Sequence, residues 1–221
     1  MIIPEAIDLE CAQLMQELYN LKPGGSDNGP FNFVLREATD YGINVGILED
    51  EKFIFMIFRG SVTQEDWARD AVSFLPETLP GVGTFPLGFS QGLEECRSTL
   101  YQYIRNAKPV ILVGHSLGAA HAGIMGQIMT RDGGTPARTV LMGCPNLVPD
   151  SAKGELINAG PVINYKNGDD FVTDVPPIDW TQIAPFEHID GGHDDWPNFF
   201  MYHHVNLYVN GIEILLNQLK G

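Results

Sequence analysis

A serine between two glycines, in the run Gly114-His115-Ser116-Leu117-Gly118, is the residue of this chain best placed to do chemistry. Glycines two residues before and two residues after the serine suit a turn in which neighbouring backbones come too close for a Cβ atom. A serine at the apex of such a turn exposes its hydroxyl as a nucleophile. The pattern predicts a nucleophile elbow at Ser116. The alternative is a glycine-rich strand-to-helix turn of ordinary α/β packing.

A serine hydroxyl is a weak nucleophile, so it needs a base, and the base needs a carboxylate to orient it. Asp169 and Asp170 are the candidate carboxylates, and His203 and His204 near the end of the chain are the candidate bases. The order serine, aspartate, histidine is that of the α/β-hydrolase fold. The residues alone leave either aspartate and either histidine open as a partner of Ser116.

These side chains are far apart in the sequence, so a sheet must bring them together. The apolar run 109–113 leads into the serine motif and an alanine- and methionine-rich run follows it, which predicts strand, sharp turn and helix. Further strands are expected at 31–38, 42–48, 52–58, 135–142 and 161–166, and helices at 5–20, 64–72, 89–105, 150–158 and 198–218. This alternation predicts a single α/β domain over residues 1–221, with a mostly parallel central sheet and helices on both faces.

Composition excludes some classes of partner. The chain of 221 residues has a formal net charge of −15, which argues against nucleic acid and against an anionic membrane surface. Its three cysteines show no metal-ligand spacing and are expected to be buried thiols. No basic leader with an apolar run opens the sequence and no apolar stretch reaches spanning length, so a cytoplasmic protein is expected, with secretion by another route left open.

Several motifs together resemble the class 3 lipases, the group of fungal triacylglycerol lipases and their bacterial relatives. The resemblance follows the order of the family's motifs through nearly the whole chain. It rests on a helix at 8–19 that ends in Tyr19, Phe58-Arg59-Gly60-Ser61 with Trp67 and Asp70, Gly114 to Ala120, Gly143-Cys144-Pro145, and Asn167 to Pro177. It implies the α/β-hydrolase fold and a lipase-like serine carboxylester hydrolase that cleaves acyl esters through an acyl-enzyme. No cofactor and no metal are implied.

The resemblance also assigns roles around the serine. Ser116 would be the nucleophile, and the backbone N–H of Leu117 together with Ser61, by its N–H alone or with its hydroxyl, would bind the oxyanion. Such donors act where negative charge develops in the transition state, and a helix that starts at the serine adds its N-terminal dipole there.

For the acid and the base, the resemblance prefers one residue of each pair. Asp170 stands before a hydrophobic residue and a valine, as the family aspartate does, and is preferred to Asp169. His203 has the family's spacing to Tyr208 and is the preferred base, with His204 as the alternative.

The stretch 71–87 is apolar, with Glu77 as its single charge. The family's lid lies in this part of the chain, so the resemblance implies that the stretch covers the cleft at Ser116 and that Phe74 and Leu75 contact an acyl chain. Its prolines and glycines argue against a regular element. The alternative is a fixed crossover packed on the core.

The expected partner is a small-molecule ester or lipid, with transient contact at a lipid interface and no stable membrane insertion. Two other functions stay open. A phospholipase or an acyltransferase would use the same triad. A non-catalytic binding protein on the same fold is less favoured, because both the serine and the histidine are present.

Overall fold

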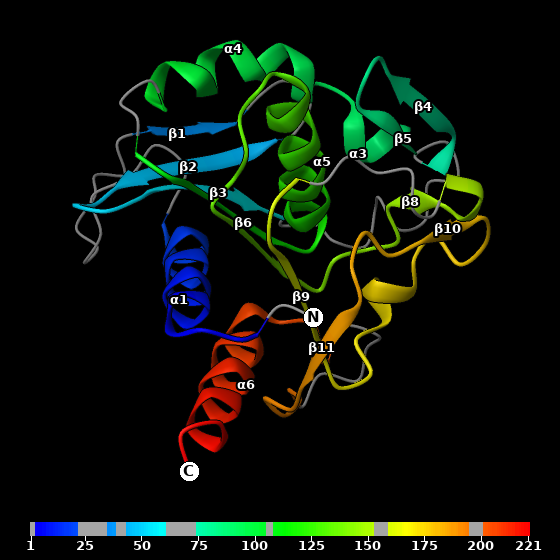
Figure 1. Cartoon of the computed structure of the whole chain (residues 1–221). Helices are drawn as coiled ribbons and strands as arrows, with labels where there is room; N and C mark the ends of the chain where they lie inside the picture. Colours follow the sequence, from blue (N-terminus) through cyan, green and yellow to red (C-terminus); the bar gives the residue numbers. More distant parts are fainter. Residues whose placement is uncertain are drawn as a thin grey trace.

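The computed structural model describes residues 3–21, 35–38, 43–60, 74–104, 108–152, 159–194 and 201–221, with the backbone alone for 35–38. Within these residues the main sheet has seven strands in the order β1-β2-β3-β6-β7-β9-β11 (Figure 1). The strands are β1 (Leu35–Ala38), β2 (Asn44–Glu49), β3 (Ile54–Arg59), β6 (Val110–His115), β7 (Arg138–Met142), β9 (Val162–Asn167) and β11 (Phe186–Ile189). Strands β3 to β11 run parallel, and β2 and β1 extend the sheet antiparallel at one edge. The mostly parallel sheet is confirmed.

Helices cover both faces of this sheet, as expected (Figure 1). On one face lie α3 (Leu87–Ser90), α4 (Leu93–Tyr103) and α5 (Leu117–Arg131). On the other face α1 (Ala6–Asn20) and α6 (Val205–Gln218) pack against each other and against the strands. Of the helices in the described parts of the chain, none has the length and apolar character needed to cross a membrane.

The strand β3 shows why the sheet is buried on both sides. Side chains alternate between the faces of a strand. Ile54, Met56 and Phe58 enter the apolar cluster on the α5 side, while Phe55 and Ile57 enter the cluster on the α1 side. All six residues of β3 are buried, so the expectation of a central strand at 52–58 is confirmed with its bounds shifted to 54–59.

Residues 76–86 form a β-hairpin, which corrects the expectation that the stretch 71–87 holds no regular element. Strand β4 (Pro76–Leu79) pairs antiparallel with β5 (Gly83–Pro86). The turn between them places Pro80 and Gly81 at its centre, with Gly81 at φ 72° and the Val82 N–H donating to the Leu79 carbonyl at 3.0 Å. Proline followed by glycine is the signature of a type II turn, so the signal was present in the sequence.

The hairpin is also part of the core. Leu79, Val82 and Phe85 are buried in the cluster on the α5 side. Residues 76–86 therefore belong to the fixed packing that was the alternative interpretation. Residues 71–73 lie outside the described part of the chain.

Other helices and strands differ from those expected, in places where only a few residues carry the sequence pattern. The helix expected at 89–105 is two helices, because Gly92 adopts a left-handed φ of 84° between α3 and α4. The segment expected to be a loop before the last helix contains β11, paired with β9, and β10 (Trp180–Thr181), paired with β8 (Val148–Pro149). The last helix begins at Val205 instead of residue 198. The helix expected at 64–72 and most of the one expected at 150–158 lie outside the described residues, and Asp150–Ala152 form a 3-10 turn.

A buried ion pair ties α1 to the sheet. Arg138 on β7 donates to Asp8 through two hydrogen bonds, from Nε to Oδ1 at 2.6 Å and from Nη2 to Oδ2 at 2.8 Å. Asp8, which is fully buried, also accepts a hydrogen bond from Tyr165 Oη at 2.9 Å. Removing one partner of such a pair would strand a charge in the core. The pair therefore holds the first turn of α1 on the sheet.

Candidate active site

The turn at Ser116 has the geometry that its glycines predict. Ser116 joins β6 to α5 at φ 60° and ψ −133°, a conformation that costs energy for any residue other than glycine. A Cβ atom at Gly114 would lie 2.3 Å from the Gly118 carbonyl oxygen, and one at Gly118 would lie 2.0 Å from the Phe58 carbonyl oxygen. Both distances are far inside van der Waals contact, so only glycine fits at either position. The strained turn with two obligatory glycines is confirmed.

The predicted oxyanion donors are the N–H groups of Leu117 and Ser61, and the structure describes the first of them and the residue before the second. Leu117 is the first residue of α5, where backbone N–H groups have no partner within the helix. Gly60, directly after β3, comes so close that a Cβ atom there would lie 2.8 Å from Ser116 Cβ. The chain that leads into Ser61 therefore touches the turn. Ser61 itself lies outside the described residues.

Asp170 and His203 form a buried pair next to Gly143, the residue that follows β7. His203 Nδ1 donates to Asp170 Oδ2 at 2.6 Å, and both side chains are fully buried. A Cβ atom on Gly143 would lie 2.7 Å from His203 Cε1 and 2.9 Å from Asp170 Oδ2, so this glycine leaves room for the pair. Because the proton sits on Nδ1, the Nε2 atom of the neutral ring carries the lone pair that can accept another proton.

Asp170 is held in its ionised form. Its carboxylate also accepts hydrogen bonds from Tyr208 Oη and from the Val172 N–H, the latter at 3.0 Å. Burial by itself raises the pKa of Asp170, but attraction to His203 and these hydrogen bonds outweigh it and hold the pKa below its usual value. The neighbouring Asp169 is exposed, so of the two candidate carboxylates the fold joins Asp170 to a histidine.

The neighbouring histidine has a different partner. His204 is the N-cap residue of α6, and its Nδ1 forms an ion pair with Asp194 Oδ2 at 2.6 Å. Its side chain is 38% exposed and that of Asp194 is 28% exposed. The fold therefore brings His203, and not His204, to Asp170.

Comparison with known proteins assigns the chain to a family. The sequence profile of lipase (class 3) matches residues 55–180, more than half of the chain. The chain belongs to the class 3 lipase family. No curated protein sequence matches it. The family makes the chain a carboxylic ester hydrolase of the lipase-like serine type, with lipid esters as its class of substrate.

Solved structures of lipases share the fold. The triacylglyceride lipase of Rhizomucor miehei superposes with a TM-score of 0.71 at 20% identity, over 83% of this chain and 79% of that one. A lipase of Rhizopus microsporus var. chinensis gives 0.70 at 17% identity, over 85% and 76%. A triacylglycerol lipase whose catalytic centre is a serine protease triad gives 0.70 at 21% identity, over 84% and 80%. At these identities the likeness shows the α/β-hydrolase fold.

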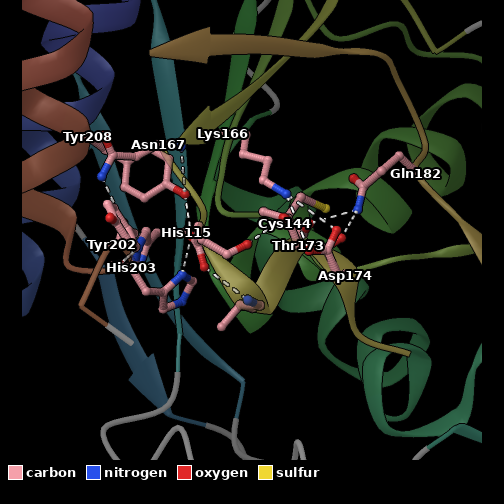
Figure 2. Close-up of polar contacts among 12 residues, drawn as sticks. His115, Cys144, Lys166, Asn167, Thr173, Asp174, Gln182, Tyr202, His203 and Tyr208 are labelled. Carbon is pink, nitrogen blue, oxygen red and sulfur yellow. Dashed lines mark hydrogen bonds and ion pairs between the residues drawn. The ribbon is translucent and has the colours of Figure 1, made fainter. Parts of the chain in front are cut away.

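Two amide side chains with no role predicted from the sequence hold the loops of this class 3 lipase site (Figure 2). Asn167 at the end of β9 donates from Nδ2 to the Tyr202 carbonyl at 2.9 Å, directly before His203. Gln182 donates to the carbonyls of Cys144 at 3.0 Å and Thr173 at 2.8 Å, which ties the end of β7 to the loop after Asp170. Asn167 lies in a family motif and could have been selected on that ground, whereas no pattern in the sequence marks Gln182.

Phe74 and Leu75 differ in their surroundings. Phe74 is half-buried and packs edge-on against Phe89, with ring centroids 6.3 Å apart. Leu75 is 53% exposed. Both line a cavity of about 970 Å³ that reaches Trp180 on β10. Over the described ranges, no three His, Cys, Asp or Glu side chains gather in a group that could hold a metal ion.

Proposed function

We propose that Ser116, His203 and Asp170 are the catalytic triad of an acyl ester hydrolase. The observation that carries the proposal is the buried Asp170–His203 hydrogen bond of 2.6 Å in a structure whose only strained serine, within the described residues, is Ser116 at the end of β6. The ring of His115, directly before Ser116, stacks on the ring of His203 with centroids 4.7 Å apart, which supports a close approach of the serine and the base.

In the proposed reaction the Ser116 hydroxyl attacks the ester carbonyl while His203 Nε2 takes its proton. The N–H groups of Leu117 and Ser61 bind the oxyanion, and loss of one such donor typically costs about 10²- to 10³-fold in kcat. The imidazolium of His203, stabilised by Asp170, returns the proton to the leaving alcohol. Water activated by the same histidine then releases the acid from the acyl-enzyme.

The direct test replaces Ser116 with alanine. We expect Ser116→Ala to lower kcat for ester hydrolysis by at least about 10³-fold, because serine and base act as one unit. A fluorophosphonate probe should label the wild type and not the variant. As a matched control, Ser90→Ala removes the hydroxyl of another buried serine, one that donates to Glu77 and the Pro86 carbonyl, and should leave labelling intact. Equal labelling of wild type and Ser116→Ala would overturn the assignment.

We propose further that the substrate carries an apolar acyl chain and is reached at a lipid interface without stable insertion. Ser116 is fully buried, so a substrate gains access only when covering groups move aside. Leu75, half exposed, lines a cavity whose lining residues do not include Ser116 or His203, so its proposed contact with such a chain rests on the position of the family's lid. Product analysis with an added alcohol separates the alternatives: free acid supports hydrolysis, and an ester of the added alcohol would point to acyl transfer.

A further inference from the structure

A chain of hydrogen bonds runs from the end of β3 to the main chain of His203. The Gly60 N–H donates to Tyr19 Oη at 3.1 Å. Tyr19 Oη and His115 Nδ1 lie 2.9 Å apart. His115 Nε2 lies 2.8 Å from the His203 carbonyl oxygen. The four residues come from four separate segments: the last turn of α1, the end of β3, the end of β6 and the turn before α6.

The direction of each bond follows from the chemistry of the partners. A carbonyl oxygen can only accept, so His115 Nε2 must carry the proton and donate to His203. In a neutral ring Nδ1 is then an acceptor, so the Tyr19 hydroxyl donates to it. The oxygen of that hydroxyl in turn accepts from the Gly60 N–H. The chain therefore determines a single tautomer for His115.

The surroundings keep His115 neutral. Burial, together with repulsion from His203, lowers the pKa of His115 to about 3. Its ring stacks on that of His203 at an interplanar angle of 29°, and the rings of Tyr19 and Tyr208 contact it at steep angles of 82° and 72°. A positive charge on this ring would oppose the imidazolium that His203 must form during catalysis.

His203 needs such support because it lies in a turn, outside any helix or strand. Asn167 holds the carbonyl of the residue before it at 2.9 Å, and His115 holds its own carbonyl. The hydrogen bond to Asp170 holds one nitrogen of the His203 ring. The other nitrogen has a fixed position only if the main chain of His203 is held as well.

We propose that Tyr19 and His115 are positioning residues, which fix the main chain of His203 and couple it to the strand end that leads into Ser61. The inference rests on the proposed function of His203 as base. It concerns how the base is held, and it assigns a role to the histidine of the Gly-His-Ser-Leu-Gly motif that the catalytic steps do not use.

The first test is kinetic. Tyr19→Phe keeps the aromatic ring and removes the hydroxyl. His115→Gln replaces the rigid imidazole ring with a flexible amide. We expect each to lower kcat for a soluble short-chain ester by about 10- to 100-fold with KM within about twofold, because a misplaced base slows chemistry more than binding. The double variant should be no slower than the slower single variant, because both break one chain of bonds. Multiplied losses in the double variant would overturn the coupling.

Tyr165→Phe is the matched control. Tyr165 is fully buried and donates to Asp8, outside the Tyr19–His115 chain. It should lower the melting temperature while kcat stays near that of the wild type. If Tyr19→Phe changed kcat no more than Tyr165→Phe at an equal loss of melting temperature, the positioning role would be overturned. The proposed function would still stand if Ser116→Ala remained inactive and unlabelled, so the two failures are distinguishable.

The second test does not depend on activity or on a folded variant. Nitrogen-15 NMR of the wild-type histidine rings reports which nitrogen carries the proton. We expect His115 to be neutral with the proton on Nε2 at pH 7. A proton on Nδ1, or a charged ring, would contradict the bond directions on which the proposal depends.

Discussion

Adjacent residues in this site differ in partner and burial. His203 is fully buried on Asp170, and His204 is partly exposed on Asp194. Asp170 is buried and Asp169 is exposed. In each pair the residue that the proposed triad uses is the one whose polar atoms are enclosed, because an enclosed hydrogen bond to a carboxylate orients a base far better than one that water can replace.

We expect His203→Ala to abolish ester hydrolysis and His204→Ala to leave kcat within about threefold of the wild type. A base that accepts the serine proton is part of the catalytic unit, whereas a surface ion pair contributes only about 0–1 kcal/mol to stability. Steady-state kinetics on a short-chain ester, with circular dichroism as a check on folding, decide the matter. An inactive, folded His204→Ala beside an active His203→Ala would show that the wrong histidine has been chosen.

At the scale of elements, the β4–β5 hairpin belongs to the fixed core beside the cavity. Its apolar side chains enter the core, while Leu75 just before it remains half exposed. A test of acyl-chain contact should therefore change Leu75 and leave the hairpin and Phe74 unchanged, because Phe74 packs on Phe89 and its loss would also lower stability.

Leu75→Ser should lower kcat/KM for long-chain esters several-fold and leave acetate esters nearly unchanged. Only a long acyl tail would touch the side chain, and an exposed leucine contributes little to folding. Hydrolysis rates across a series of rising acyl length measure the effect. A uniform loss over all chain lengths, or no loss on any, would remove Leu75 from the substrate path.

The placement of α1 gives a second prediction for an element. Arg138→Met should lower the free energy of unfolding by about 3–5 kcal/mol, because it leaves Asp8 charged and buried without its partner. The double variant Arg138→Met with Asp8→Leu should recover part of that loss, because the buried charge is gone although Tyr165 loses its acceptor. Urea denaturation measures both. If the double variant were as unstable as the single one, packing rather than charge would explain the loss.

The whole molecule should lose stability in mild acid through its buried neutral histidines. Burial lowers the pKa of His115 to about 3, with repulsion from His203 adding to the effect, and burial lowers that of His121 to about 4. An unfolded histidine titrates near ~6.5. Below that pH the histidines of the unfolded chain bind protons and those of the folded chain do not. Their contribution to the free energy of unfolding is therefore fully present above pH ~6.5 and is lost as the pH falls.

We expect each of the two histidines to lower the free energy of unfolding by up to about 1.4 kcal/mol per pH unit between pH ~6 and pH ~4.5. His121→Leu should reduce the slope of the free energy of unfolding against pH by the amount that corresponds to one proton bound on unfolding. Met125→Leu on the same helix should leave the slope unchanged. Urea denaturation at several pH values gives the slopes. An unchanged slope in His121→Leu would mean that His121 titrates normally in the folded protein.

Features that depend on neighbouring residues could be predicted from the sequence. The turn at Ser116 needs glycine at Gly114 and Gly118 because of contacts within a few residues and with the adjacent strand, and the apolar run of β3 needs burial on both faces. The hairpin at 76–86 belongs to the same class, since Pro80-Gly81 marks its turn. The family motifs predicted the order in which the site residues follow one another along the chain.

Tertiary structure alone decided the features that depend on distant partners. The four residues of β11 form a strand because β9 offers them a parallel edge, which no local preference encodes. The family resemblance preferred His203, but the residues alone left His203 and His204 open, and the choice depends on the turn that Asn167 holds at Tyr202, 35 residues away in the chain. Tyr19 and His115 are separated by 96 positions. Sequence patterns report preferences over a few residues, whereas these contacts exist only once packing has closed the long loops between their partners.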